Sequence, residues 1–277
     1  MEKVQDFKKI VQDKYGQIAL DEKQDNACCD TACCGSEVYN IMSDSYDEVE
    51  GYIKDADLGL GCGLPTQFAR IKKDEVVVDL GSGAGNDAFI ARHETGEMGR
   101  VVGIDFTPAM IDRARENNKV RGFTNVEFLE GDIEKMPLPD NFADVIVSNC
   151  VLNLVPDKAS VFKEIFRVLK PGGHFSISDI VLNGQLPSGI QSAAEMYAGC
   201  VSGAIHKDSY LQMIRENGFS DMIIQKEKVI ELPGDILSNY LDESEIAEFK
   251  NSGTGIFSIT VYAEKPAKSC CGPECCN

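Results

Sequence analysis

Short apolar segments alternate with helical patterns between residues 75 and 182, and this alternation restricts the fold more than any other feature of the chain. Pro108 suits the first turn of one helix, and Pro156-Asp157 begins another, which ends at Lys170-Pro171-Gly172-Gly173. Five apolar segments predict buried strands, at 75–81, 100–106, 125–132, 143–150 and 173–181. Strands that alternate with helices predict an α/β fold, in which helices cover both faces of a parallel sheet.

The chain on either side of this region is less regular. Beyond Leu182 a mostly helical segment includes Cys200, and it is followed by a helix at 209–219 and two closing strands at 222–230 and 255–265. The end of the chain, KSCCGPECCN, has no apolar anchor and is expected to form a tail. We therefore divide the chain into an N-terminal region, a central core, a region with the closing strands and a cysteine-rich tail, at 1–70, 71–182, 183–265 and 266–277.

Charge and cysteine content exclude several classes of protein. The formal net charge of −18 would repel a phosphate backbone, so we expect no nucleic-acid partner. No apolar run approaches the roughly 20 residues of a membrane span, and the charged first residues do not resemble a secretory signal. We therefore expect a cytoplasmic protein with no membrane partner. Eleven cysteines in such a chain favour thiol chemistry or metal binding over a disulfide scaffold.

The segment DLGSGAG, at 79–85, follows the first predicted strand and begins a helix. Glycines at such a turn permit positive φ and allow a ligand to approach the backbone closely. The dinucleotide pattern is G-x-G-x-x-G, whereas this chain has G-x-G-x-G preceded by an acid. The segment therefore resembles the first motif of class I S-adenosylmethionine methyltransferases. A generic nucleotide-binding domain, such as that of an oxidoreductase, is the alternative.

Two further acids end the next two predicted strands. Asp105 ends the second strand, where a carboxylate can accept hydrogen bonds from both ribose hydroxyls, and Asp132 ends the third, where this family binds the adenine. The resemblance implies that these acids bind the cofactor together with the glycine segment and two neighbouring positions. The expected cofactor-binding residues are Asp79, Gly81, Gly83, Gly85, Asp105, Asp132, Ile133 and Asn149.

Three single cysteines are expected to converge at the same edge of the sheet. Cys62 lies in the loop GLGCGLP before the first strand, Cys150 ends the fourth strand, and Cys200 lies beyond the fifth. Doubly wound sheets bind ligands outside the carboxyl ends of their strands, where the strand order reverses. In the methyltransferase fold this point lies between the first and fourth strands, so Cys150 is expected to face the methyl group. A buried and inert cysteine is the alternative at each position.

The three thiolates would form a soft, trigonal site. Soft sulfur ligands prefer soft acceptors, whereas a structural zinc ion requires four ligands that are usually closely spaced in sequence. A pyramidal As(III) centre binds three sulfurs and keeps a lone pair, which can attack an electrophilic methyl group. The cysteine pattern therefore favours trivalent arsenic as the methyl acceptor.

Taken together, GLGCGLP, DLGSGAGND, SNCVLNL, LKPGG and AGCVSGAIHKDSY resemble the arsenite methyltransferases, from YGQIA near residue 15 to about residue 220. The resemblance implies a Rossmann-like class I fold with a mostly parallel, seven-stranded sheet. It implies As(III) bound by Cys62, Cys150 and Cys200, and a thiol–disulfide relay through an N-terminal cysteine. NACC favours Cys28 or Cys29 for the relay, with Cys33 and Cys34 as competitors.

The same resemblance implies the partners. As(III) is expected to arrive as a complex with glutathione or another small thiol, and a thiol reductant, glutathione or a thioredoxin-like protein, is expected to restore As(III) after each transfer. Nothing in the sequence fixes the oligomeric state, and a monomer is the working expectation. The chain departs from some members of the family at Leu58, Gly59 and Leu60, where they have aromatic residues.

Several features leave alternatives open. The two CCxxxCC segments, at 28–34 and 270–276, are expected to deliver arsenic, to act in redox exchange, to bind a soft metal or to have no set role. His206 is expected either to cap a helix or to lower the pKa of a thiol. A methyltransferase for a quinone or sterol-like carbon would not need the three cysteines, and a thiol-rich metal-binding protein would not need the cofactor.

Overall fold

The computed structural model describes residues 2–20, 44–184, 201, 203–230, 237–238, 240–252 and 254–267. The predictions for Cys28, Cys29, Cys33, Cys34 and Cys200, and for the CCxxxCC segment at 270–276, fall outside these residues. Among the described residues, no helix combines the length and the apolar character that a membrane span requires.

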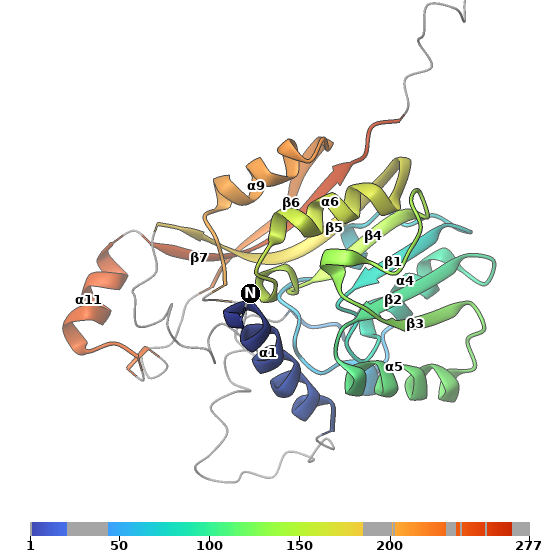
Figure 1. The fold of residues 1–277 in the computed structure, drawn as a ribbon, viewed down its shortest axis with the longest axis horizontal. Coiled ribbons are helices and arrows are strands. Elements are labelled where there is room, and N and C mark those ends of the chain that lie inside the picture. The colour runs from blue at the N-terminus through green and yellow to red at the C-terminus, as the bar shows by residue number, and fades with distance from the viewer. Residues whose placement is uncertain are drawn as a thin grey trace, which may run out of the picture.

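The centre of the fold is a seven-stranded sheet with the order β3-β2-β1-β4-β5-β7-β6 (Figure 1). The strands are β1 (Val76–Leu80), β2 (Arg100–Asp105), β3 (Val126–Glu130), β4 (Ala143–Asn149), β5 (Leu169–Asn183), β6 (Ser220–Ile230) and β7 (Gly255–Glu264). The first five strands pair in parallel, while β7 is antiparallel to both β5 and β6. The expected seven-stranded, mostly parallel class I fold is confirmed.

Helices cover both faces of this sheet. The helices of the described residues are α1 (Glu2–Leu20), α3 (Pro65–Phe68), α4 (Asn86–Thr95), α5 (Pro108–Arg121), α6 (Lys158–Val168), α9 (Lys207–Glu216) and α11 (Glu243–Asn251), with short 3-10 turns η1 (Lys54–Ala56), η2 (Ile133–Lys135) and η3 (Leu152–Leu154), and α11 lies beyond the end of the sheet (Figure 1). Alternate strand residues face opposite layers, because Val77 packs with Phe89 of α4 whereas Val78 packs in the cluster that contains Phe162 of α6. Figure 1 shows α6 and α9 on the side of the sheet away from α5.

The predicted element ends are mostly confirmed. Pro108 is at the start of α5, and the Asp157 side chain caps α6 by accepting a hydrogen bond from Ser160 N. The prediction that 170–173 lies between a helix and a strand is wrong, because β5 begins at Leu169. The cause is pairing across the sheet: Gly172 N donates to Lys265 O, and Lys265 N donates to Gly173 O.

The helix α1 was not predicted within the N-terminal region. It packs beside α5, where Gln12 Nε2 donates to Phe106 O at 2.8 Å and Arg113 Nη1 donates to Ala19 O at 2.9 Å. Val11 is fully buried in the same apolar cluster as Cys150. The helix therefore lies at the carboxyl edge of the sheet, where the ligand site was expected.

The stability of the layer formed by α6 depends on Phe162. Its fully buried ring makes an edge-on contact with Tyr210, with the centroids 5.4 Å apart, and also packs against Phe175. Phe162→Ala should lower the free energy of unfolding by about 3–5 kcal/mol, because it leaves a cavity between α6 and β5. Urea denaturation would measure this, with the exposed Met98→Ala expected to change stability by less than about 0.5 kcal/mol. A similar loss in both variants would contradict this account of the core.

Candidate functional site

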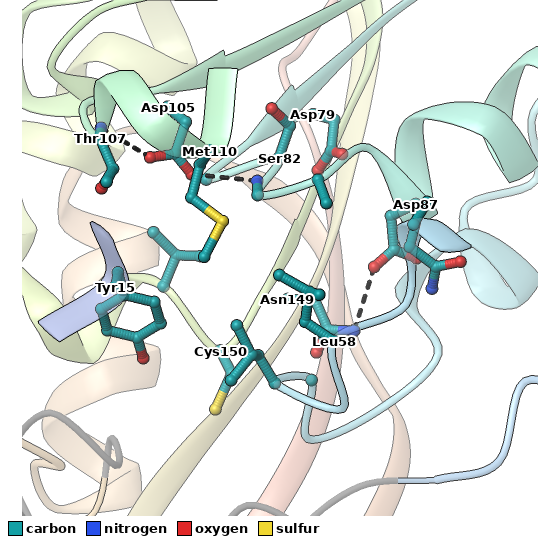
Figure 2. A pocket seen from close by; sticks show the side chains of 18 of the residues that line it. Tyr15, Leu58, Asp79, Ser82, Asp87, Asp105, Thr107, Met110, Asn149 and Cys150 are labelled. Atoms are coloured by element: carbon teal, nitrogen blue, oxygen red, sulfur yellow. Dashed lines mark hydrogen bonds between the residues drawn. The ribbon is translucent and has the colours of Figure 1, made fainter. Parts of the chain in front are cut away.

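A pocket lies at the carboxyl ends of β1, β2 and β4 (Figure 2). Strand β1 pairs with β2 on one side and with β4 on the other, so the strand order reverses here. The walls of the pocket come from the glycine loop after β1, the ends of β2 and β4, helix α1 and the loop at 56–61. This is the place at which doubly wound sheets bind their ligands.

The glycines of the loop serve different purposes. Gly81, Gly83 and Gly85 all have positive φ, at 67°, 51° and 100°. A Cβ at Gly85 would lie 2.8 Å from the rings of Phe89 and Phe128, whereas a Cβ at Gly83 would meet only the Met110 sulfur, at 4.0 Å. Gly85 is therefore required by packing, while Gly83 leaves open space that a ligand can fill.

Three buried carboxylates lie in the wall of this pocket. Asp79, Asp87 and Asp105 are 2%, 8% and 8% exposed. Burial raises the pKa of Asp79 well above its usual value, and the negative charges of Asp87 and Asp105 raise it further. No lysine, arginine or histidine is among the described residues that line the pocket. The electrostatic field therefore favours a cationic ligand.

Asp105 lies where the sequence predicts the ribose. Its carboxylate accepts hydrogen bonds from Gly83 N at 3.0 Å and from Thr107 N at 2.8 Å, as Figure 2 shows. Burial raises its pKa, while these backbone donors lower it. The Thr107 hydroxyl and Phe106 N also contribute hydrogen bonds that lower the pKa of this carboxyl, so any ribose hydroxyl would share the carboxylate oxygens with them.

The polar lining of the pocket fits the cofactor that the resemblance implies. Asp79 Oδ2 and Ser82 Oγ are buried and have no hydrogen-bond partner among the described residues. Such atoms are rare unless a ligand or water satisfies them. S-adenosylmethionine carries a sulfonium and an ammonium group, which suit an acidic pocket, whereas the pyrophosphate of a dinucleotide does not. The residues present therefore fit S-adenosylmethionine better than a dinucleotide.

Asp132 and Ile133 lie in an adjoining pocket, which shares Gly81, Asp105 and Phe106 with the first. The Asp132 side chain has partners that were not predicted: Oδ1 accepts from Glu134 N at 2.9 Å, and Oδ2 forms an ion pair with Lys8 Nζ at 2.6 Å. Lys8 also pairs with Glu134. Helix α1 thus closes the end of the site where the sequence predicts the adenine.

Asn149 lines the pocket, but its amide is largely occupied by the protein. Its Nδ2 donates to Tyr46 Oη at 2.6 Å, to Gly63 O at 2.8 Å and to Asp87 Oδ2 at 3.2 Å. Its Oδ1 accepts from Cys62 N at 3.0 Å. Asn149 therefore ties the Cys62 loop to the end of β4.

The two cysteines that the structure describes lie in one buried cluster. Cys62 is 0% and Cys150 is 4% exposed, and both pack with Leu154, Ile180 and Val11. Neither forms a disulfide with a described residue. The described residues contain no group of three side chains that would hold a metal ion. The fold thus places two of the three predicted cysteines in one buried cluster, and the third, Cys200, lies outside the described residues.

Backbone contacts hold both cysteines. Cys150 follows β4 in a left-handed conformation, with φ of 61°, and its N–H donates to Ser178 O of β5 at 2.8 Å. A residue other than glycine is strained in this left-handed conformation, so the surrounding contacts must hold Cys150 in place. The Cys62 carbonyl accepts a hydrogen bond from Ser258 Oγ of β7 at 2.5 Å. The backbone of both cysteines is therefore anchored to the sheet.

Sequence reasoning missed several site residues. Tyr15, Tyr46 and Met110 line the pocket, and Thr66 Oγ1 donates to Asp87 at 3.2 Å. Asp87 follows the glycine loop by two positions, which was the one local signal available. His206 proves to be a helix cap, because its Nδ1 accepts from Asp208 N at the start of α9.

Two glycine substitutions should separate packing from ligand contact. Gly85→Ala should lower stability by about 1–2 kcal/mol for the left-handed backbone and by a further amount of about 1–3 kcal/mol for overpacking. Gly83→Ala should lower stability only by the amount for the left-handed backbone. It should nevertheless weaken S-adenosylmethionine binding at least about tenfold, which is about 1.4 kcal/mol. Thermal melting and calorimetry would test this. Wild-type affinity in Gly83→Ala would show that the loop does not touch the cofactor.

Cofactor affinity should depend on pH through Asp87. Burial raises its pKa to about 6, although hydrogen bonds from Asn149, Tyr46 and Thr66 lower it. Between pH 7.5 and 5.5 the carboxyl gains a proton, the pocket loses a negative charge, and affinity for the cationic cofactor should fall about 3- to 10-fold. Calorimetry at several pH values would measure this, and Asp87→Asn should remove most of the dependence.

As the pH falls, the contribution of Asp87 to the stability of the ligand-free protein should increase, whereas cofactor affinity decreases. A raised pKa means that the folded state binds the proton more tightly than the unfolded state. The contribution of Asp87 to stability is therefore complete below its usual pKa of about 4, and it is lost as the pH rises through about 6. If Asp87→Asn kept the wild-type pH profile of cofactor affinity, the pH dependence of that affinity could not be assigned to Asp87.

Comparisons with known proteins identify the family of the chain. Residues 71–218 match a family model described as a methyltransferase domain. The chain is 40% identical to the arsenite methyltransferase of Halobacterium salinarum, over 93% of this chain and 63% of that protein. It is 31% identical to the arsenite methyltransferase of Aquipseudomonas alcaligenes, over 84% of this chain and 68% of that protein.

A solved structure is similar as well. The arsenic(III) S-adenosylmethionine methyltransferase of Chlamydomonas reinhardtii matches with a TM-score of 0.64 and 31% identity, over 84% of this chain and 74% of that chain. The present chain is shorter than these relatives and spans under two thirds of the length of the Halobacterium protein. Identity at this level over most of the chain, together with the shared fold, shows that the chain belongs to the arsenite methyltransferase family.

Proposed function

We propose that the protein transfers the methyl group of S-adenosylmethionine to trivalent arsenic held by cysteine thiolates. The observation that carries this proposal is the position of Cys62 and Cys150. Both are buried in one cluster, and Cys150 also lines the acidic pocket beside Asp105 and the glycine loop. A soft acceptor bound by these sulfurs would therefore be held next to a cationic methyl donor.

The roles of the residues follow from the site. S-adenosylmethionine, when bound, supplies an electrophilic methyl group on a sulfonium. Asp79 and Asp87 favour its positive charges, and Asp105 accepts the ribose hydroxyls. Asn149 holds the Cys62 loop against β4, so both thiols keep their places before the substrate arrives. Such preorganisation provides the near-attack geometry on which this kind of transfer depends.

Arsenic exchange and methyl transfer balance without a general base. As(III) arrives with small thiols, and each cysteine thiol replaces one of them, so no net proton is released. The arsenic lone pair forms the As–C bond while the C–S bond breaks, and its electrons stay on sulfur, which becomes a neutral thioether. The arsenic is then formally As(V). Two electrons from a pair of thiols, which form a disulfide, return it to As(III).

The rest of the chain has a place in this proposal. Residues 1–70 supply Cys62 and a relay thiol, Cys28 or Cys29, and residues 71–182 bind the cofactor. Residues 183–265 supply Cys200 as the third sulfur, and the tail at 266–277 is not needed for the first transfer. Glutathione or a thioredoxin-like protein then reduces the relay disulfide.

Replacement of the thiols tests the function directly. Cys150→Ser and Cys200→Ser keep the size of the side chain but replace a soft ligand with a hard one. Both variants should bind S-adenosylmethionine, yet lose methylation of inorganic As(III) by at least about 100-fold, or about 2.7 kcal/mol. Cys62→Ser should also fail on inorganic As(III) but retain activity on monomethylarsenite, which has only two positions left for sulfur.

Mass spectrometry of the arsenic products, with As(III), S-adenosylmethionine and glutathione present, provides the measurement. Cys275→Ser in the tail is the matched control and should keep the wild-type rate. Full activity of Cys150→Ser or Cys200→Ser would rule out the three-thiolate site. A wild-type protein that binds both ligands but forms no methylated arsenical would contradict the proposed function as a whole.

A further inference from the structure

The cofactor pocket and the adjoining pocket differ in the charges that line them. Asp105 lines both pockets, whereas the buried Asp79 and Asp87 line only the first, and Lys8 and Asp132 line only the second. The acids of the first pocket suit the ammonium end of S-adenosylmethionine. A cofactor whose ribose is bound at Asp105 and whose amino-acid end lies in the first pocket therefore has its base in the adjoining pocket, beside Lys8.

The walls of the adjoining pocket suit the faces of an aromatic base. They come from one ring and four aliphatic side chains: Phe106, Ile133, Val151, Leu154 and Val155. Such walls favour any flat apolar ring and do not distinguish one purine from another. Apart from Asp105, the described polar side chains of this pocket are Lys8 and Asp132. Discrimination at the edge of the base therefore falls to these two residues.

The Asp132 carboxylate is held at both of its oxygens. Its Oδ1 accepts a hydrogen bond from Glu134 N at 2.9 Å, and its Oδ2 pairs with Lys8 Nζ at 2.6 Å. Lys8 also pairs with Glu134, whose Oε1 accepts from Asp157 N at 3.2 Å. Each carboxylate oxygen has a second lone pair, which can accept a further donor. Lys8 therefore fixes the orientation of Asp132 without using all of its acceptor positions.

Other contacts anchor the helix that carries Lys8. Gln12 Nε2 donates to Phe106 O at 2.8 Å, and Ala19 O accepts from Arg113 Nη1 at 2.9 Å. A substitution of Lys8 leaves both of these hydrogen bonds in place. The effect of Lys8 on Asp132 can therefore be separated from the attachment of α1.

We propose that Lys8 is a positioning residue for base selection, because it holds the Asp132 carboxylate toward the 6-amino group of the adenine. Adenine presents a hydrogen-bond donor at this position, whereas hypoxanthine presents a carbonyl oxygen. A carboxylate only accepts, so hypoxanthine would set two acceptors against each other. This penalty requires a carboxylate that cannot turn away. The inference rests on the cofactor position in the proposed function and is independent of how arsenic is bound.

Two ligands that differ only at position 6 of the base test the proposal, S-adenosylhomocysteine and S-inosylhomocysteine. In calorimetry without arsenic, the wild type should prefer the adenosyl ligand at least about tenfold, which is about 1.4 kcal/mol. Lys8→Met removes the charge and frees Asp132, so the preference should fall below about threefold. Lys8→Arg keeps an ion pair and should keep the preference. Lys8→Gln is a second uncharged variant, in case Lys8→Met does not fold.

Two control variants separate base selection from the attachment of α1. Lys9→Met changes an exposed neighbour that lines neither pocket, and Gln12→Ala removes another anchor of the helix. Both should keep the wild-type preference, even where both affinities fall.

Three results would overturn the proposal. Equal losses for the two ligands in Lys8→Met and Lys8→Gln would show that Lys8 only attaches the helix. Unchanged affinities in these variants would show that Lys8 has no effect on the base, and a wild type without a preference would show that Asp132 does not select it. None of these results would bear on arsenic methylation, which is tested by the cysteine variants.

Discussion

The hydrogen bonds of the Asn149 amide join parts of the chain that are far apart in sequence. One side chain at the end of β4 holds Cys62 N and Gly63 O, and it also contacts Tyr46 and Asp87. A Cβ at Gly61 would lie 2.6 Å from its Nδ2, so the Cys62 loop approaches it as closely as a glycine allows. This amide and Ser258 Oγ, which donates to Cys62 O at 2.5 Å, together hold the Cys62 loop against the sheet.

The same network explains how three carboxylates can be buried together. Charges without partners are expensive in a protein interior, and here hydrogen bonds from Asn149, Tyr46 and Thr66 offset part of the cost for Asp87. Asp79 keeps an oxygen without a partner among the described residues, and its pKa is raised well above the usual range. The ligand-free site is thus held in an electrostatically unfavourable state, which a cationic cofactor relieves.

Local patterns predicted the strands, the glycine loop and the place of Cys150, because each of these has a signal within a few residues. The contacts that complete the site have no such signal. Lys8 and Asp132 are 124 positions apart, and Cys62 and Asn149 are 87 apart. Side chains that meet only in the folded state leave no periodicity in the sequence, so the contacts of α1 and the role of Asn149 were not predictable from it.

The cofactor pocket and the cluster that contains Cys62 and Cys150 are formed by different parts of the chain. Most of the cofactor pocket comes from consecutive loops that follow β1, β2 and β4, and its shape is set by the sheet itself. The cluster that contains Cys62 and Cys150 is assembled from distant segments, since Val11 of α1, Ile256 of β7 and Leu241 before α11 belong to it. Cofactor binding therefore depends on the stable core, whereas the geometry of the thiols depends on how the N-terminal and C-terminal segments pack over it.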